Sequence, residues 1–122
     1  LIEAAGSVAA LTQWPPLEAI DKLLNLLLEL WKKYQTTLLL IYKLNRAELG
    51  ALAALHDDYL GKIIQLFEKI ERTELLRYSD PRLTALVIYK TAVPLLEILQ
   101  NLDDFDCLFI SSMKSLIFKN NS

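Results

Sequence analysis

The side chains best suited to chemistry are those of the single histidine, His56, and the single cysteine, Cys107. A structural zinc site needs about four nitrogen or sulfur ligands, which these two side chains cannot supply, so we expect neither a metal nor a cofactor. A catalytic nucleophile needs a base beside it, and the sequence has neither a nucleophile elbow nor a glycine-rich phosphate loop. We therefore predict that the protein is not an enzyme.

A second group of side chains is better suited to binding. Each combines an apolar body with a polar group on an otherwise apolar helical face, and small-molecule pockets are mostly apolar with a few polar groups that fix orientation. Together with one isoleucine from the same helical stripe, the predicted residues of a pocket for a small apolar or amphipathic molecule are Trp31, Tyr42, His56, Tyr59, Ile63 and Tyr89. The alternative is an ordinary core in which the backbone satisfies the hydroxyls and the imidazole.

Length and composition indicate one helical domain over residues 1–122. With 122 residues, 53% of them hydrophobic, the chain is too short for several domains and too apolar to be disordered. Its longest unbroken apolar stretches, such as 38–42 and 85–89, are much shorter than a membrane span. A lone cysteine favours a reducing compartment, so we expect a cytoplasmic protein. The net charge of −2, without a basic cluster, argues against a nucleic-acid surface in these residues.

The spacing of apolar residues predicts an all-α bundle of six helices, packed in orthogonal and antiparallel pairs. The first covers residues 1–12 and ends where Trp14 precedes two prolines, since residues before proline avoid the α region. The expected ranges of the others are 16–34, 38–44, 48–72, 81–101 and 105–118, with fraying from Lys119 onward. Two apolar stripes face the core: Leu17, Ile20, Leu24, Leu27, Trp31 and Tyr34 on the second helix, and Leu49, Leu52, His56, Tyr59, Ile63, Phe67 and Ile70 on the fourth.

The helix from Pro81 carries the sharpest local signals. Asp80 is expected to cap it by accepting hydrogen bonds from free amides, and Pro81 at N1 has no amide to satisfy. Pro94, inside this helix, removes the hydrogen bond to the carbonyl of Lys90 and bends the axis. The bend either opens space beside the pocket or is merely tolerated.

The last two helices carry more apolar surface than one side of a small bundle can cover. Exposed apolar patches usually mark association, and such a helix pair packed against its own copy gives a four-helix interface in a homodimer. The predicted interface residues are Leu95, Ile98, Phe109, Met113 and Leu116. The alternative is that the preceding helices cover these side chains completely.

Two segments add a family resemblance to this pattern. Residues 14–20 read WPPLEAI, and residues 80–87 read DPRLTALV. With the order of the helices, these segments resemble the starts of the second regulatory helix and the penultimate helix in the C-terminal regulatory domain of TetR-family transcription regulators. The likeness covers nearly the whole chain. It departs from the family at residues 71–76, ERTELL, where relatives often have a glycine at the bend.

The resemblance implies a homodimer through the last two helices and an effector pocket among the second, fourth and fifth. It places a helix-turn-helix DNA-binding domain upstream of Leu1, in agreement with a chain that begins inside a helical pattern and whose only methionine is Met113. An effector would shift the dimer between separations of the DNA-binding heads, with residues 1–12 as the connecting lever. We therefore expect a bacterial regulator that binds DNA only through that domain and does not associate with a membrane. The alternative is a helical protein-interaction module without a small ligand.

Overall fold

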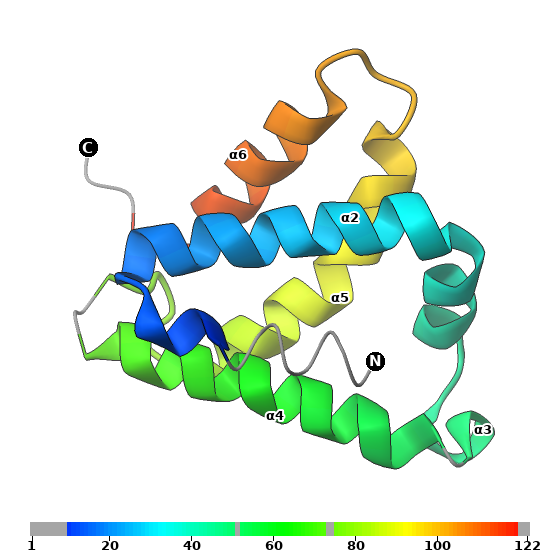
Figure 1. The fold of residues 1–122 in the computed structure, drawn as a ribbon, viewed down its shortest axis with the longest axis horizontal. Coiled ribbons are helices and arrows are strands. Elements are labelled where there is room, and N and C mark those ends of the chain that lie inside the picture. Colours follow the sequence, from blue (N-terminus) through cyan, green and yellow to red (C-terminus); the bar gives the residue numbers. More distant parts are fainter. Residues whose placement is uncertain (1–9, 51, 73–74, 120–122) are drawn as a thin grey trace.

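A computed structural model gives the fold and describes residues 10–50, 52–72 and 75–119; the side chains of Arg46, Leu52, Leu55 and His56 lie outside this description. In chain order the elements are the 3-10 turn η1 (Leu11–Gln13) and the helices α2 (Pro16–Lys43), α3 (Arg46–Leu49), α4 (Leu52–Glu71), α5 (Pro81–Leu99) and α6 (Phe105–Ile117), as Figure 1 shows. The described residues form no strand and contain one isolated β-bridge. The predicted all-α class is confirmed.

The chain reaches α2 through η1 and two prolines. Residues 1–9, most of the predicted first helix, lie outside the described residues, and the described end of that segment is a 3-10 turn. Trp14 then takes extended backbone with ψ of 154°, as the following proline requires. Leu11 is 8% exposed and belongs to the core, and η1 contacts both α2 and α4. The turn before α2 is therefore packed against two helices of the domain.

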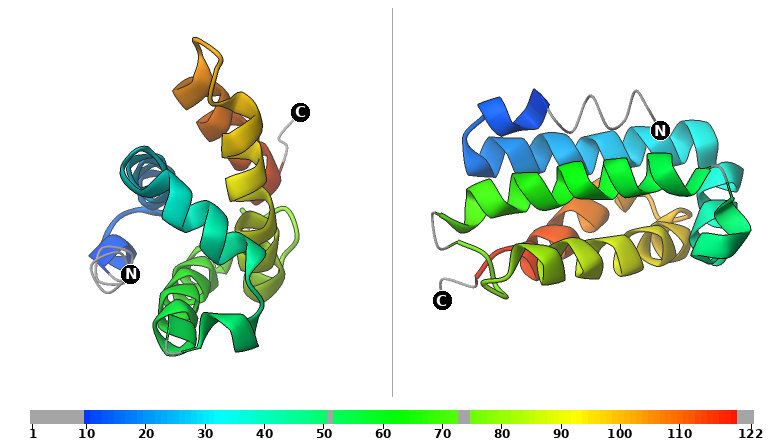
Figure 2. Two further views of the ribbon diagram at one scale, coloured as in Figure 1. Left: turned by 90° about the vertical axis from the view of Figure 1, so that its right-hand side faces the viewer. Right: turned by 90° about the horizontal axis from the view of Figure 1, so that it is seen from below.

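Helix α2 consists of two helical segments joined by a kink. Tyr34 has φ −131° and ψ 34°, outside helical geometry, one residue before the predicted interruption. The second segment, residues 35–43, turns away from the first and crosses to the level of α4 at one end of the molecule (Figures 1 and 2). The predicted helix 38–44 is therefore present, but it continues directly from the kink.

The buried side of α2 differs in part from the predicted stripe. Its buried residues are Ala19, Ile20, Leu23, Leu24, Leu28 and Trp31. Leu17 and Tyr34, which the stripe included, are 59% and 53% exposed. These two residues lie at the ends of the first segment, where neighbouring helices leave the surface open, so that part of the prediction is wrong.

The predicted helix from Glu48 begins too early, because Asn45 and Glu48 cap a separate short helix, α3. The Glu48 amide donates to Asn45 Oδ1 at 2.8 Å, and the Asn45 amide donates to Glu48 Oε1 at 3.2 Å. Gly50 then has φ +57° and ψ −124°, a backbone conformation that favours glycine. This residue ends α3, and α4 begins at Leu52.

Helix α5 begins as predicted. The amides of Arg82 and Leu83 donate to Asp80 Oδ1 at 2.9 and 3.2 Å, and Pro81 occupies N1. The helix continues through Pro94. Its start is thus fixed by the two residues that the sequence singles out.

Helix α6 returns the chain to the loop that precedes α5. The Arg77 amide donates to the Ile117 carbonyl, and the Lys119 amide donates to the Leu75 carbonyl, both at 2.9 Å. Fraying was predicted from Lys119 onward, but Lys119 itself is held by this loop. Two ion pairs, Lys32 with Asp106 and Asp21 with Lys114, join α2 to α6; both are about half exposed, so each contributes about 0.2–1 kcal/mol.

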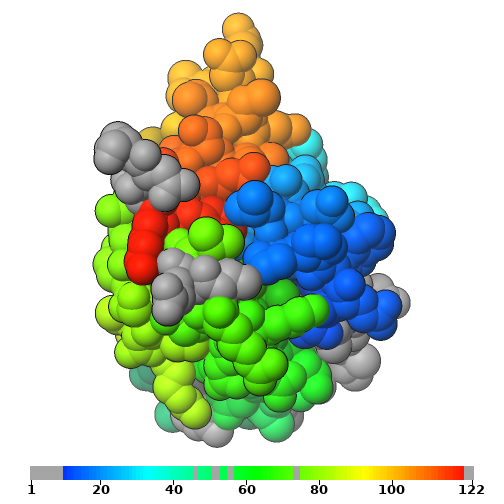
Figure 3. Space-filling model, turned by 90° about the vertical axis from the view of Figure 1, so that its left-hand side faces the viewer, coloured from blue at the N-terminus to red at the C-terminus, as the bar shows by residue number. Residues whose placement is uncertain are grey.

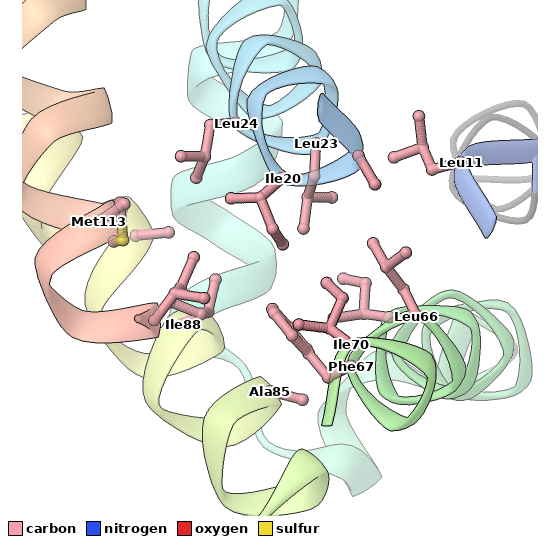
Figure 4. Close-up of a cluster of buried hydrophobic side chains, with 14 of the residues drawn as sticks. Leu11, Ile20, Leu23, Leu24, Leu66, Phe67, Ile70, Ala85, Ile88 and Met113 are labelled. Carbon is pink, nitrogen blue, oxygen red and sulfur yellow. The ribbon is translucent and has the colours of Figure 1, made fainter. Parts of the chain in front are cut away.

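The core lies between α2, α4 and α5, with η1 and α6 at its sides (Figure 4). Helices α2 and α4 run antiparallel, and so do α5 and α6 (Figures 1 and 2). The side chains labelled in Figure 4 come from all of these elements: Leu11, Ile20, Leu23, Leu24, Leu66, Phe67, Ile70, Ala85, Ile88 and Met113. The turn between α5 and α6 projects from the body of the molecule as a tip, orange in Figure 3.

Candidate functional site

An apolar cavity of about 100 Å³ lies between α2, α4 and α5. Its lining residues are Leu23, Leu27, Leu30, Leu38, Ile41 and Tyr42 of α2, Tyr59 and Ile63 of α4, and Ile88, Tyr89, Ala92, Val93 and Leu96 of α5. None of these side chains carries a charge at neutral pH, and three tyrosine hydroxyls are their only polar groups. The composition is that of a binding site for an apolar ligand with few polar contacts.

One wall of the cavity is the second segment of α2, and two hydrogen bonds tie this segment to α5 and to the turn after it. Tyr42 donates its hydroxyl to the carbonyl of Lys90 at 3.2 Å, and Gln35 Nε2 donates to Gln100 Oε1 at 2.6 Å. The Lys90 carbonyl can accept from Tyr42 because Pro94, four residues later, has no amide to offer it. Pro94 thus leaves the Lys90 carbonyl free to accept the hydrogen bond that holds the second segment of α2 against α5.

Among the described residues, the hydroxyl of Tyr59 has no hydrogen-bond partner. This hydroxyl is also buried. Burial raises the pKa of Tyr59 to about 12, so at neutral pH the group remains a neutral O–H donor. Burial and, to a smaller extent, the neighbouring Tyr42 also raise the pKa of Tyr89.

The structure brings several of the predicted pocket residues to one place. Tyr42, Tyr59, Ile63 and Tyr89 all line the cavity, although they come from three helices. Trp31 is 3% exposed and lies in the core, but it is not part of the cavity wall. His56 belongs to α4, and its side chain lies outside the described residues.

Most of the apolar wall was not predictable from the sequence. Five of the lining residues of α2 and four of α5 are aliphatic, and an aliphatic side chain on a cavity wall has the same pattern as one in a filled core. Pro94 offered the one local signal, because the carbonyl that it frees at Lys90 needs a donor from a neighbouring element. Tyr42 is that donor.

The predicted interface residues fall into two groups. Ile98 is 74% exposed, and Leu95 and Leu116 are half-buried. Phe109 and Met113 are both 0% exposed in the core of a single chain, so their assignment to an interface is wrong. Helix α6 turns these two side chains inward against the other helices, and only its outer side can meet a partner.

Other apolar side chains of α5, of α6 and of the turn between them are also exposed. Leu102, in the projecting turn, is 51% exposed, and Leu108 at the start of α6 is 39% exposed. Leu83 and Leu86, nearer the start of α5, are 41% and 48% exposed. With Ile98, these four residues form what we call the hairpin surface.

Compared with protein-family models, curated proteins and solved structures, the chain has no significant match. The cavity and the hairpin surface are therefore the features that bear on the function of the chain.

Other features of the described residues support no alternative site. No group of three or more His, Cys, Asp or Glu side chains in that part of the chain could hold a metal ion. A more open hollow beside α6 contains Arg77, Lys114 and Lys119, but Arg77 Nε donates to the Ser115 carbonyl and Lys114 pairs with Asp21. Across the described residues, no helix has both the length and the apolar character of a membrane span.

Proposed function

We propose that this chain is the effector-binding and dimerisation domain of a TetR-type transcription regulator from a bacterium, with a binding role and no catalytic one. The observation that carries the proposal is the apolar cavity between α2, α4 and α5. The family resemblance expects an effector pocket among these helices. DNA would be bound by a separate helix-turn-helix domain.

The position of η1 offers a route from the cavity to such a domain. Leu11 packs between α2 and α4, the helices that also form two walls of the cavity. A ligand that changes the separation of these helices also changes the position in which η1 packs against them. An effector with unequal affinity for the two arrangements shifts the population of the dimer by that difference in binding free energy.

The partner in this proposal is a second copy of the chain. The hairpin surface leaves apolar side chains of α5, of the projecting turn and of α6 exposed on one chain, and exposed apolar patches usually mark association. Packing the α5–α6 pair against its copy buries them in a four-helix interface. Leu95, Ile98 and Leu116 remain in the proposed interface.

A thermal-shift titration tests the effector site. Small neutral apolar compounds are expected to raise Tm, with the rise growing in proportion to the logarithm of their concentration above Kd. Ala92 lines the cavity and is 6% exposed, so Ala92→Leu fills the site and should abolish the shift. Leu17→Ala, at an exposed position outside the cavity, is the control and should leave it intact.

Two results would contradict the proposal. One is a set of compounds that leaves Tm of the natural chain unchanged up to their solubility, which would favour the interaction module without a ligand. The other is a shift that survives in Ala92→Leu, which would show that binding takes place outside the cavity.

A further inference from the structure

The cavity wall restricts the charge of a ligand. None of the lining residues that the structure describes is an acid or a base, and moving an ion from water into apolar surroundings without a counter-ion is strongly unfavourable. The nearby cation of Lys90 lies over the Tyr89 ring, 5.3 Å from its centroid, and the Lys90 side chain is exposed. A carboxylate or an ammonium group inside the cavity would therefore lose its hydration and gain no charged partner among the described lining residues.

The hydroxyls of the wall restrict the polarity of a ligand. Tyr42 already donates its proton to the Lys90 carbonyl, whereas the buried hydroxyl of Tyr59 donates to no described group. A buried donor without an acceptor lowers the stability of a protein. Burial also raises the pKa of Tyr59 to about 12, which keeps the hydroxyl in its donor form. The oxygen of this hydroxyl is covered in the free chain, so a turn of the Tyr59 ring toward the cavity would let an acceptor on the ligand complete this hydrogen bond.

The volume of the cavity restricts the size of a ligand. At about 100 Å³, it is smaller than an engineered apolar cavity of about 150 Å³ that binds benzene. A single small ring or a short branched chain fits this space. A larger ligand would extend beyond this space, one wall of which is the segment 35–43 that the hydrogen bonds of Gln35 and Tyr42 hold in place.

From these three restrictions we infer, on the basis of the effector-binding function proposed above, that the cavity takes a compact neutral molecule with one hydrogen-bond acceptor. The acceptor, a carbonyl or ether oxygen, faces the hydroxyl of Tyr59. The rest of the molecule is hydrocarbon and contacts the aliphatic wall. Tyr59 is thus a specificity-determining residue, because it separates ligands with an acceptor from hydrocarbons of the same shape.

Three small molecules of matched size test this assignment on the whole chain. Cyclopentanone offers a carbonyl acceptor, methylenecyclopentane has the same shape without an acceptor, and cyclopropanecarboxylate carries a charge. Ligand-observed NMR titrations give the three dissociation constants for the natural chain, for Tyr59→Phe and for Tyr78→Phe. Tyr78 is 37% exposed in the loop before α5 and does not line the cavity, so it is the matched tyrosine control.

Tyr59→Phe is expected to weaken cyclopentanone binding about 3- to 10-fold, the usual effect of one lost neutral hydrogen bond. The same variant should change methylenecyclopentane binding less than about twofold, because only the hydroxyl is removed. Tyr78→Phe should change neither. The carboxylate should not bind at concentrations that saturate the site with the ketone.

Each contrary result has its own meaning. Equal effects of Tyr59→Phe on the ketone and the alkene would overturn the assigned role of Tyr59 and leave the effector site standing. Carboxylate binding as tight as that of the ketone would overturn the restriction to neutral ligands. If neither the ketone nor the alkene bound to the natural chain, or if both still bound to Ala92→Leu, the effector site itself would be wrong.

Discussion

At the scale of single residues, Tyr59 and Tyr42 show how the same side chain takes different roles in one cavity. The hydroxyl of Tyr42 is occupied by the Lys90 carbonyl and serves to hold the wall. Tyr59 also lines the cavity, but its buried hydroxyl has no hydrogen-bond partner among the described residues. A buried donor without an acceptor lowers the free energy of unfolding, and a ligand that supplies an acceptor would offset this loss. This contrast makes Tyr59 the residue on which ligand selectivity depends.

Replacing Tyr59 with phenylalanine should reduce the loss of stability at alkaline pH. Burial raises the pKa of Tyr59 from 10.0 to about 12, so the folded state holds the phenolic proton more tightly than the unfolded state does. The resulting stability is fully present below pH 10.0 and is lost as the pH rises towards about 12. At about 1.36 kcal/mol per pKa unit, the loss is roughly 2–3 kcal/mol. Urea unfolding across this pH range measures it.

Tyr78→Phe provides the comparison for the alkaline experiment. Lysines and other tyrosines also titrate in this range, so only the difference between two single variants isolates Tyr59. The free energy of unfolding of Tyr78→Phe should fall with pH as steeply as that of the natural chain, because Tyr78 is exposed. Equal slopes for Tyr59→Phe and Tyr78→Phe would show that the Tyr59 hydroxyl is not buried in its neutral form.

Residue types predicted the cavity only in part. An amphipathic side chain on an apolar stripe signals a polar group in need of a partner, and Tyr42, Tyr59 and Tyr89 all line the cavity. Trp31 satisfies the same description but faces the filled core. Periodicity identifies the buried side of a helix, whereas the position of a void on that side depends on how the neighbouring helices pack.

At the scale of elements, the second segment of α2 links the kink at Tyr34 to Pro94 in α5. The kink turns residues 35–43 across the end of the bundle, and the carbonyl that Pro94 frees at Lys90 accepts the hydroxyl of Tyr42. Two helix irregularities far apart in the sequence therefore meet at one hydrogen bond. Tyr42, which donates this hydrogen bond, also lines the cavity.

A double-mutant cycle on Tyr42 and Pro94 tests that link. Tyr42→Phe should lower the free energy of unfolding by about 1 kcal/mol, because the Lys90 carbonyl loses its donor. Pro94→Ala restores a backbone amide that can donate to the same carbonyl, so Tyr42→Phe should cost clearly less in that background. Urea denaturation of the four proteins gives the coupling free energy. Additive losses would mean that the Tyr42 hydrogen bond does not depend on the proline.

Helix boundaries were predictable where a single capping residue sets the end of the helix. Asp80 caps α5 because its carboxylate accepts from the first amides, and the sequence alone shows this. The start of α4 was not predictable, because the apolar period continues through Gly50. A Cβ at Gly50 would meet no heavy atom within 4 Å, so the positive φ, and not lack of space, requires glycine there. That conformation follows from the way the chain turns into α4.

At the scale of the whole molecule, the chain covers only part of the apolar surface of its last two helices. The sequence showed an excess of apolar positions but could not divide them between core and surface. Phe109 and Met113 are wholly buried within one chain, while Ile98 in the last turn of α5 and Leu102 in the turn that follows stay exposed. The orientation of α6 against α2 and α5 decides which apolar side chains are buried and which are exposed. The ion pairs of Lys32 and Asp21 with α6 help to fix this orientation.

Ile98→Glu should convert the proposed dimer into monomers without lowering Tm of the single chain. Ile98 is 74% exposed in one chain, so a carboxylate there stays hydrated in the monomer but would be buried without a partner in a four-helix interface. Sedimentation equilibrium measures the mass. Leu17→Glu, at a 59% exposed position outside the hairpin surface, should leave the dimer intact, whereas Met113→Glu should unfold the chain because Met113 is 0% exposed. A natural chain that sediments as a monomer, or an Ile98→Glu variant that keeps the dimer mass, would contradict the proposed interface.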